Sequence, residues 1–125
     1  MISFSLWDIV RNLAIGGALT LLLSLLAFVL GGAAGLLVLF ARIGKWRVPR
    51  ALAQIHIELF QGTPLLLQLF TLFFSLSLFG LDMPAWLAAT LGLTLFTSAF
   101  LAEIWRGCVE SIPKGQWEAS ACLAM

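Results

Sequence analysis

The sequence predicts an all-α membrane protein, and three observations predict it. Of the 125 residues, 62% are hydrophobic and only 10% are charged, and the charged residues are confined to a few short segments. A soluble domain of this length needs more polar surface than so few charged residues supply. A helix satisfies its own backbone polar groups inside a bilayer, so the long uncharged segments are expected to be transmembrane helices.

Three segments are long enough to cross a bilayer as helices. Long stretches within residues 13–41, 57–81 and 83–105 contain no Asp, Glu, Lys or Arg, and a helix needs about 20 residues to cross a hydrocarbon core of about 30 Å. The first is too long for the apolar part of a secretory signal peptide, which has about 7–15 residues. We therefore expect residues 1–125 to form one membrane domain with three spans.

The charged residues also predict an orientation. The segment between the first two spans contains four basic side chains and no acidic one, which by the positive-inside rule places it in the cytoplasm. The N-terminus is then expected outside, and residues 106–125 in the cytoplasm. Residues 80–84, which contain no Lys or Arg, are expected to form an external turn.

Glycines in the first span permit close approach of another helix. Gly31 and Gly35 have GxxxG spacing, which is interpreted either as ordinary helix packing or as a specific dimer face.

The second span is interrupted by Gln61, Gly62, Thr63 and Pro64, because proline has no N–H group for a helical hydrogen bond. Either a helix over residues 50–61 is followed by a new helix that begins at Pro64 and is capped by Thr63, or one long helix is kinked. The break either lines a polar pathway or marks the membrane surface.

Few polar side chains are available for chemistry. Glu103 either pairs with Arg106, three residues later, or faces a polar pathway, where its carboxylate could hold a cationic or amino group. Hydroxyl and amide groups within the spans usually bridge helices; they belong to Gln68, Thr94, Thr97 and Ser98. His56 stands alone and is given no catalytic role. Because no phosphate-binding loop or catalytic triad can be assembled, we expect neither an enzyme nor a cofactor or metal.

Two stretches resemble a known family. Residues 58–68 read ELFQGTPLLLQ, which resembles the E-x-F-R-G-T-P-L-L-x-Q segment of the permease subunits of polar amino acid importers of the ATP-binding cassette class. Residues 99–107 and 111–120 resemble the A-Y-x-A-E-I-x-R-G and S-I-P-K-G-Q-x-E-A-A segments of the same family, in the same order and spacing. The sequence departs from the family pattern at five positions, which are Gln61, Phe100, Cys108, Ser120 and Ala124.

The resemblance implies a permease fold with five core helices, of which this chain supplies the first three. The chain stops inside the family's cytoplasmic EAA loop, which favours a fragment or a truncated reading frame over a new three-helix transporter. The EAA segment docks on an ATPase subunit, and here its residues are Gly115, Gln116, Glu118, Ala119 and Ser120. The pathway candidates are Glu58, Gln61, Thr63, Pro64, Gln68, Ser98 and Glu103.

The partners that the resemblance implies are an ATP-binding cassette ATPase, a second permease copy or paralogue, and an extracytoplasmic substrate-binding protein, in the bacterial inner membrane. No nucleic acid is expected. Two alternatives remain at the level of sequence, a small membrane scaffold or regulatory subunit without transport activity, and a small oligomeric channel. A scaffold has no need of an EAA segment, and a channel predicts a ring of like polar residues along one helix face, which is not seen.

Overall fold

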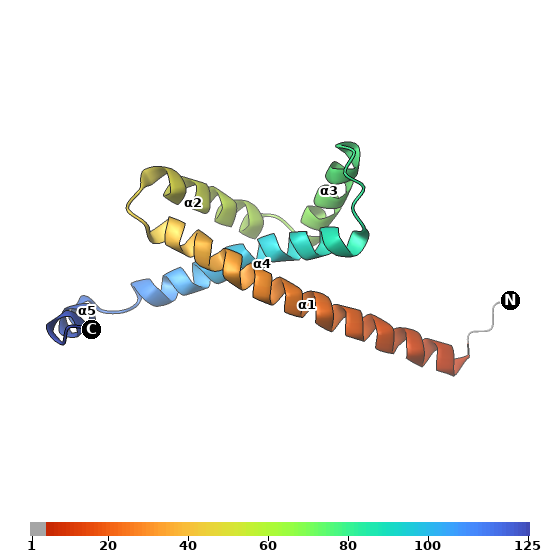
Figure 1. Ribbon diagram of the computed structural model, residues 1–125, viewed down its shortest axis with the longest axis horizontal. Coiled ribbons are helices and arrows are strands. Elements are labelled where there is room, and N and C mark those ends of the chain that lie inside the picture. The colour runs from red at the N-terminus through yellow and green to blue at the C-terminus, as the bar shows by residue number, and fades with distance from the viewer. Residues whose placement is uncertain (1–4) are drawn as a thin grey trace.

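The computed structural model describes residues 5–125, and their regular structure is entirely helical. The five helices are α1 (Leu6–Ile43), α2 (Arg47–Gly62), α3 (Leu65–Leu78), α4 (Ala85–Glu110) and α5 (Lys114–Cys122). Figure 1 shows the two long helices α1 and α4 crossing each other, with α2 and α3 beside them and α5 beyond the end of α4. The predicted all-α membrane fold is confirmed.

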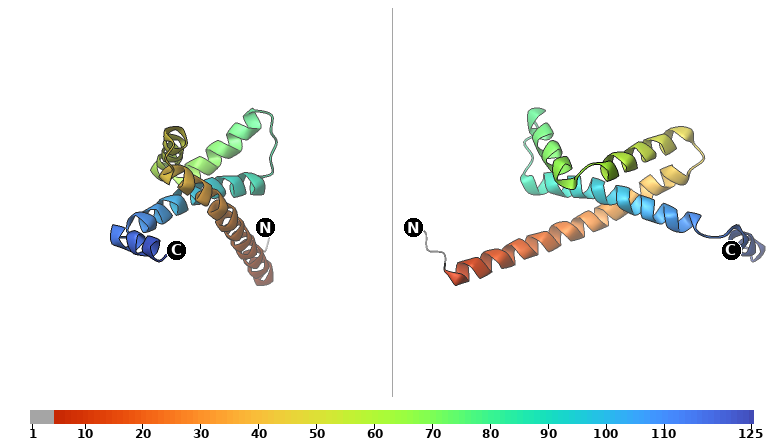
Figure 2. Two further views of the ribbon diagram at one scale, coloured as in Figure 1. Left: turned by 60° about the vertical axis from the view of Figure 1, so that its left-hand side comes forward. Right: turned by 180° about the vertical axis from the view of Figure 1, so that it is seen from behind.

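The first helix is longer than the predicted span of residues 13–41. It begins after Ser5, whose Oγ accepts a hydrogen bond from the Trp7 N–H group at 3.3 Å. Its 38 residues correspond to about 57 Å at the helical rise, well beyond a hydrocarbon core of about 30 Å. The N-terminal half extends away from the other helices (Figure 2), and its large apolar side chains are exposed.

The predicted second span consists of two helices rather than one. α2 and α3 meet at 111° across Thr63 and Pro64, which is the first of the two expected geometries. α3 has 14 residues, about 21 Å, and is too short to cross a bilayer alone. Within residues 5–125, α1 and α4 are therefore long and apolar enough to cross a membrane, and a third span exists only if the bent pair counts as one.

One detail of the predicted break is wrong. Thr63 does not cap α3, because Pro64 takes the N-cap position and no side-chain cap bond forms there. The Thr63 hydroxyl instead donates backwards to the Leu59 carbonyl oxygen at 2.8 Å. It therefore stabilises the end of α2 and not the start of α3.

The contact between α1 and α4 is built on glycines. A Cβ atom placed on Gly31 would lie 2.7 Å from the Thr97 Cβ, and one on Gly35 would lie 3.1 Å from the Ser98 carbonyl oxygen. Carbon atoms in contact are normally about 3.5–4.0 Å apart, so a side chain at Gly31 does not fit. α4 packs against the GxxxG face of α1. This confirms the interpretation of the two glycines as ordinary packing between helices of one chain.

Three helices meet at one small buried cluster. Leu39 of α1, Ile57 of α2 and Ala102 of α4 form it, and Val38 and Trp105 pack against it. By contrast, α3 has no fully buried residue. The cluster therefore fixes α2 against the α1–α4 pair, up to the break at which α3 departs.

The glycine contact predicts a difference between two glycine substitutions. Gly31→Ala should destabilise the protein by about 1–3 kcal/mol, the usual cost of overpacking, because the added Cβ collides with Thr97. Thermal unfolding in detergent, followed by tryptophan fluorescence, measures this. The control is Gly16→Ala, whose added Cβ has no atom within 4 Å; it should leave the Tm unchanged or raise it. Equal Tm values would contradict the close approach.

Candidate functional site

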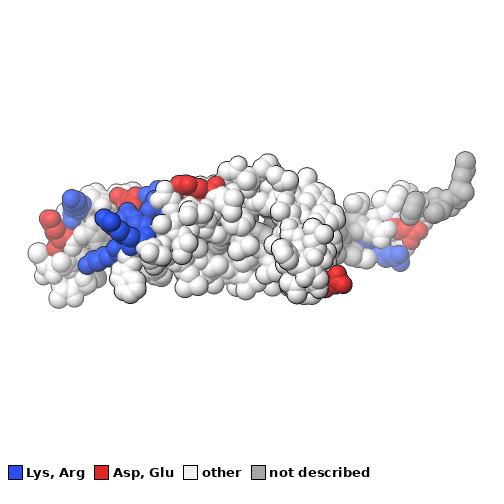
Figure 3. All heavy atoms as spheres, turned by 90° about the horizontal axis from the view of Figure 1, so that it is seen from above, with Lys and Arg blue, Asp and Glu red and all other residues white. Residues whose placement is uncertain are grey.

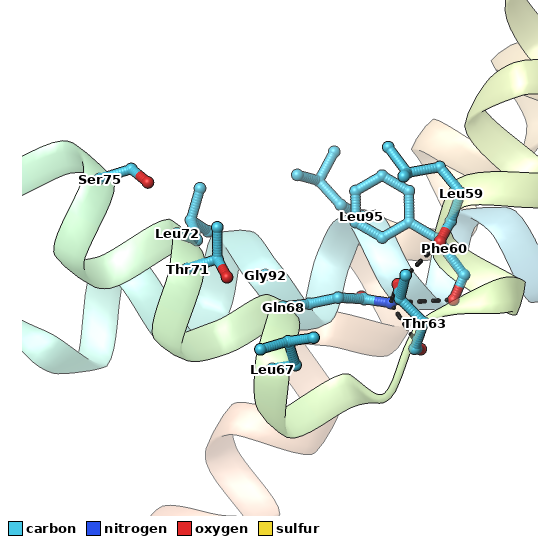
Figure 4. A pocket seen from close by; sticks show the side chains of 10 residues that line it. All are labelled: Leu59, Phe60, Thr63, Leu67, Gln68, Thr71, Leu72, Ser75, Gly92 and Leu95. Atoms are coloured by element: carbon cyan, nitrogen blue, oxygen red, sulfur yellow. Dashed lines mark hydrogen bonds between the residues drawn. The ribbon is translucent and has the colours of Figure 1, made fainter.

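The break between α2 and α3 is held by one side chain, Gln68. Its Nε2 group donates to the Phe60 carbonyl oxygen at 3.0 Å and to the Thr63 carbonyl oxygen at 2.9 Å, and lies 2.5 Å from the Thr63 Oγ1 (Figure 4). In an uninterrupted helix the Phe60 carbonyl would accept from residue 64, but Pro64 has no N–H group. The Gln68 amide supplies the missing donor.

A cavity opens beside this amide. It has a volume of about 320 Å³ and lies between α2, α3 and α4, within the size range of sites for small molecules. Most of its wall is apolar, and the polar side chains that line it are Thr63, Gln68, Thr71 and Ser75. The Gln68 Oε1 atom is buried and accepts no hydrogen bond from the described residues. The cavity therefore combines mainly apolar walls with a few polar side chains near the break.

Two of the predicted pathway residues lie beside the break but do not line the cavity. Glu58 and Gln61 are both exposed on α2. Glu58 Oε1 accepts a hydrogen bond from Gln54 Nε2, one turn earlier, at 2.8 Å. The structure thus brings Thr63, Pro64 and Gln68 together at the break and leaves these two side chains outside.

Ser98 lies in a different place, in the contact between α2 and α4. It is 1% exposed, and its Oγ donates to the Leu95 carbonyl oxygen at 2.7 Å and lies 2.9 Å from His56 Nε2. A hydroxyl has a single hydrogen, and which of the two groups donates in this pair depends on the tautomer of His56. The pair therefore joins α2 to α4 through a polar contact inside an otherwise apolar interface.

His56 was given no catalytic role from the sequence, and its contact with Ser98 was not predicted, because the two residues are 42 positions apart. One feature of the sequence could have predicted the contact between His56 and Ser98. His56 neighbours Ala53 and Ile57, the two buried residues of α2, and helical periodicity places all three on one face.

Glu103 forms an ion pair with Arg106, which was one of the two expectations for this residue. Arg106 donates from Nε to Glu103 Oε2 at 3.0 Å and from Nη2 to Glu103 Oε1, and its Nη1 group pairs with Glu110. The Arg106 and Glu103 side chains are 24% and 33% exposed. The carboxylate of Glu103 is therefore neutralised within α4 itself.

The predicted docking residues lie in α5, a nine-residue helix that follows Pro113. Gly115, Gln116, Glu118 and Ala119 are exposed, and Ser120 is half-buried with its hydroxyl donating to the Trp117 carbonyl oxygen at 2.9 Å. Figure 1 shows this helix beyond the end of α4, far from the break. The structure therefore separates the docking residues from the pathway candidates at the break.

Comparison with known proteins shows what this chain is similar to. No protein-family model matches the chain. It is 33% identical to the L-cystine transport system permease protein TcyB of Bacillus subtilis over 124 residues, which are 95% of this chain and 53% of that protein. It is 37% identical to the inner membrane amino-acid ABC transporter permease protein YhdY of Escherichia coli over 114 residues, which are 87% of this chain and 31% of that protein.

A solved structure, that of an amino acid ABC transporter with histidines, matches with a TM-score of 0.84 and 31% identity. The match covers 99% of this chain and 59% of the other. These homologues are amino-acid ABC transporter permeases. The present chain spans about half the length of most of the curated permeases that it matches.

The hydrogen bonds of the Gln68 amide at the break predict that removing this amide destabilises the protein. Gln68→Met keeps a side chain of similar length but removes the donor, and it leaves the Phe60 and Thr63 carbonyl groups without their partner. The expected cost is about 1–3 kcal/mol in the free energy of unfolding, as for other unsatisfied buried groups. Chemical unfolding in detergent measures it. The exposed Gln61→Met should cost much less, and an equal cost would show that the amide does not hold the break.

Proposed function

We propose that this chain forms part of the membrane-spanning permease of an ATP-driven amino acid uptake system. The observation that supports this most strongly is the likeness to the solved amino acid ABC transporter, which extends over nearly the whole chain, including the break. The relatives' names support amino acids as the substrate class. The substrate crosses the membrane, and hydrolysis of ATP takes place in a partner subunit.

The pathway in this proposal lies along the break. Helices interrupted at membrane depth are tolerated where they line a cavity or are buried in protein, and Thr63 and Gln68 line a cavity here. Pro64 causes the interruption, while Glu58 and Gln61 extend its polar edge along α2. Ser98 and Glu103 act differently, since both are engaged with other side chains. They position α4 behind the pathway.

Coupling in this proposal goes through α5. The helix is short, exposed and separated from α4 by Pro113, and Trp117 on it is 53% exposed. A large aromatic side chain beside Glu118 suits burial in the groove of a partner protein. Closure of the ATPase subunits would then move α4 as a rigid body, which is one established form of alternating access.

The remaining partners follow from the same proposal. A second permease copy or paralogue covers apolar surface that this chain leaves exposed, and an extracytoplasmic binding protein delivers the amino acid. The protein lies in the bacterial inner membrane, with its N-terminus outside and α5 in the cytoplasm. The basic segment between α1 and α2 supports this orientation by the positive-inside rule.

Uptake of labelled amino acids tests the proposal directly. The permease is expressed together with a candidate ATPase and a candidate binding protein, and the purified complex is reconstituted in vesicles. We expect accumulation of at least one labelled amino acid that requires ATP and the binding protein. A stable complex that accumulates no amino acid would overturn the proposal and favour a scaffold or regulatory subunit.

The docking assignment predicts the effect of reversing one charge. Glu118→Arg should reduce both co-purification with the ATPase and coupled ATP hydrolysis at least tenfold, because a misplaced charge at an interface costs several kcal/mol. The matched control is Asp82→Arg, an exposed residue in the segment between α3 and α4. It should change neither quantity. If the two variants behaved alike, α5 would not be the docking element.

A further inference from the structure

A strongly basic surface lies at the junction of α1 and α2, away from the break. We call Arg42, Lys45, Arg47 and Arg50 the basic patch. Arg42 is in the last turn of α1, Lys45 is in the connection, and Arg47 and Arg50 are in the first turn of α2. Figure 3 shows most Lys and Arg side chains gathered towards one end of the molecule, with Asp and Glu side chains beside them, next to a middle part that carries few charges.

The basic patch has no anionic partner of its own. Within residues 5–125, the ion pairs join Arg11 to Asp8, and Arg106 to Glu103 and Glu110. Arg42 is attracted to Glu103, but the ion pair of that carboxylate is with Arg106. The first turn of α2 contains no acidic residue. Four basic side chains therefore lie within nine residues of sequence, and none of them forms an ion pair within residues 5–125.

The position of the basic patch along α1 places it at a membrane surface. No charged residue lies between Arg11 and Arg42, and that stretch is about 45 Å long at the helical rise. Trp46 and Val48, between the basic residues, are 78% and 70% exposed. Tryptophan is enriched where the hydrocarbon meets the headgroups, so these side chains fit the interface and the cations fit the headgroup layer above it.

A hollow beside the basic patch provides space for part of a lipid. It has a volume of about 360 Å³ and is lined by Phe40, Ala41, Gly44, Lys45, Trp46 and Pro49. Lys45 supplies the positive charge at this hollow, and the other lining groups are apolar or backbone. This combination matches a phospholipid, which joins a charged phosphate to apolar chains.

We propose that the basic patch binds an anionic phospholipid, with the phosphodiester headgroup at Lys45 and Arg47 and the start of the acyl chains at Trp46. The proposal requires only that α1 lies in a membrane, and it does not depend on transport. α2 begins in the basic patch and ends at the break. Lipid binding therefore fixes one end of α2 in the headgroup layer and limits how far the helix moves at its other end.

Native mass spectrometry of the full-length permease in mild detergent tests the proposal. Dioleoyl-phosphatidylglycerol and dioleoyl-phosphatidylcholine, which have the same acyl chains, are titrated separately. Each Lys or Arg near a membrane surface strengthens attraction to anionic lipid about fivefold. The double variant Lys45→Gln with Arg47→Gln should therefore bind phosphatidylglycerol at least tenfold more weakly, with little change for phosphatidylcholine. Arg42 and Arg50 are kept in this variant, so that the connection between α1 and α2 still carries the positive charge that sets the orientation of the protein in the membrane.

Two controls separate charge from damage to the fold. Arg47→Lys keeps the charge and should change phosphatidylglycerol affinity less than twofold. Lys114→Gln removes an exposed charge outside the basic patch and should also have less than a twofold effect. Equal affinities for the two lipids, or an unaffected double variant, would overturn the proposal. So would a double variant that keeps lipid binding but loses the ATPase, since the basic patch would then be a protein interface.

Discussion

The contact between α1 and α4 is the constraint on which the other contacts depend. In a bilayer, lipid tails are as apolar as leucine, so helices associate mainly through close packing and polar contacts. Gly31 and Gly35 allow a close approach of α4 to α1, in which an added Cβ would collide with Thr97 at Gly31 and make a tight contact at Gly35. The cluster that holds α2 uses both helices at once, through Leu39 and Ala102. Without the glycine contact, α2 would lose the surface on which it lies, and the break would lose its fixed position.

At the break, a side chain replaces a backbone hydrogen-bond donor that proline lacks. Pro64 ends the hydrogen-bond pattern of α2, and in an apolar setting the Phe60 carbonyl left without a donor would be costly. Gln68 restores the donor from the next helix. The Gln68 side chain also lines the cavity beside the break. A proline and a glutamine four residues later thus act together, and they produce a bend and a polar group at the same place.

Much of this could be predicted from local sequence. The uncharged segments, the GxxxG face and the interruption at Pro64 depend on residues close together in the chain, and the i,i+3 spacing of Glu103 and Arg106 already permitted their ion pair. The contact between His56 and Ser98 was missed because it joins two helices 42 residues apart. The function of Thr63 was also mistaken, since a hydroxyl at a break can bond to either helix. Packing between distant parts of the chain decides which partner each of these side chains takes, and this packing cannot be derived from a single sequence.

The length of α1 has a mechanical consequence. Its buried residues run from Ala27 to Leu39, so about 20 residues, or about 31 Å of helix, extend beyond the contact with α4. A rotation of about 10° at that contact would displace the far end by about 5 Å at this length. α1 is therefore long enough for a small change in its angle to α4 to produce a large displacement at its far end.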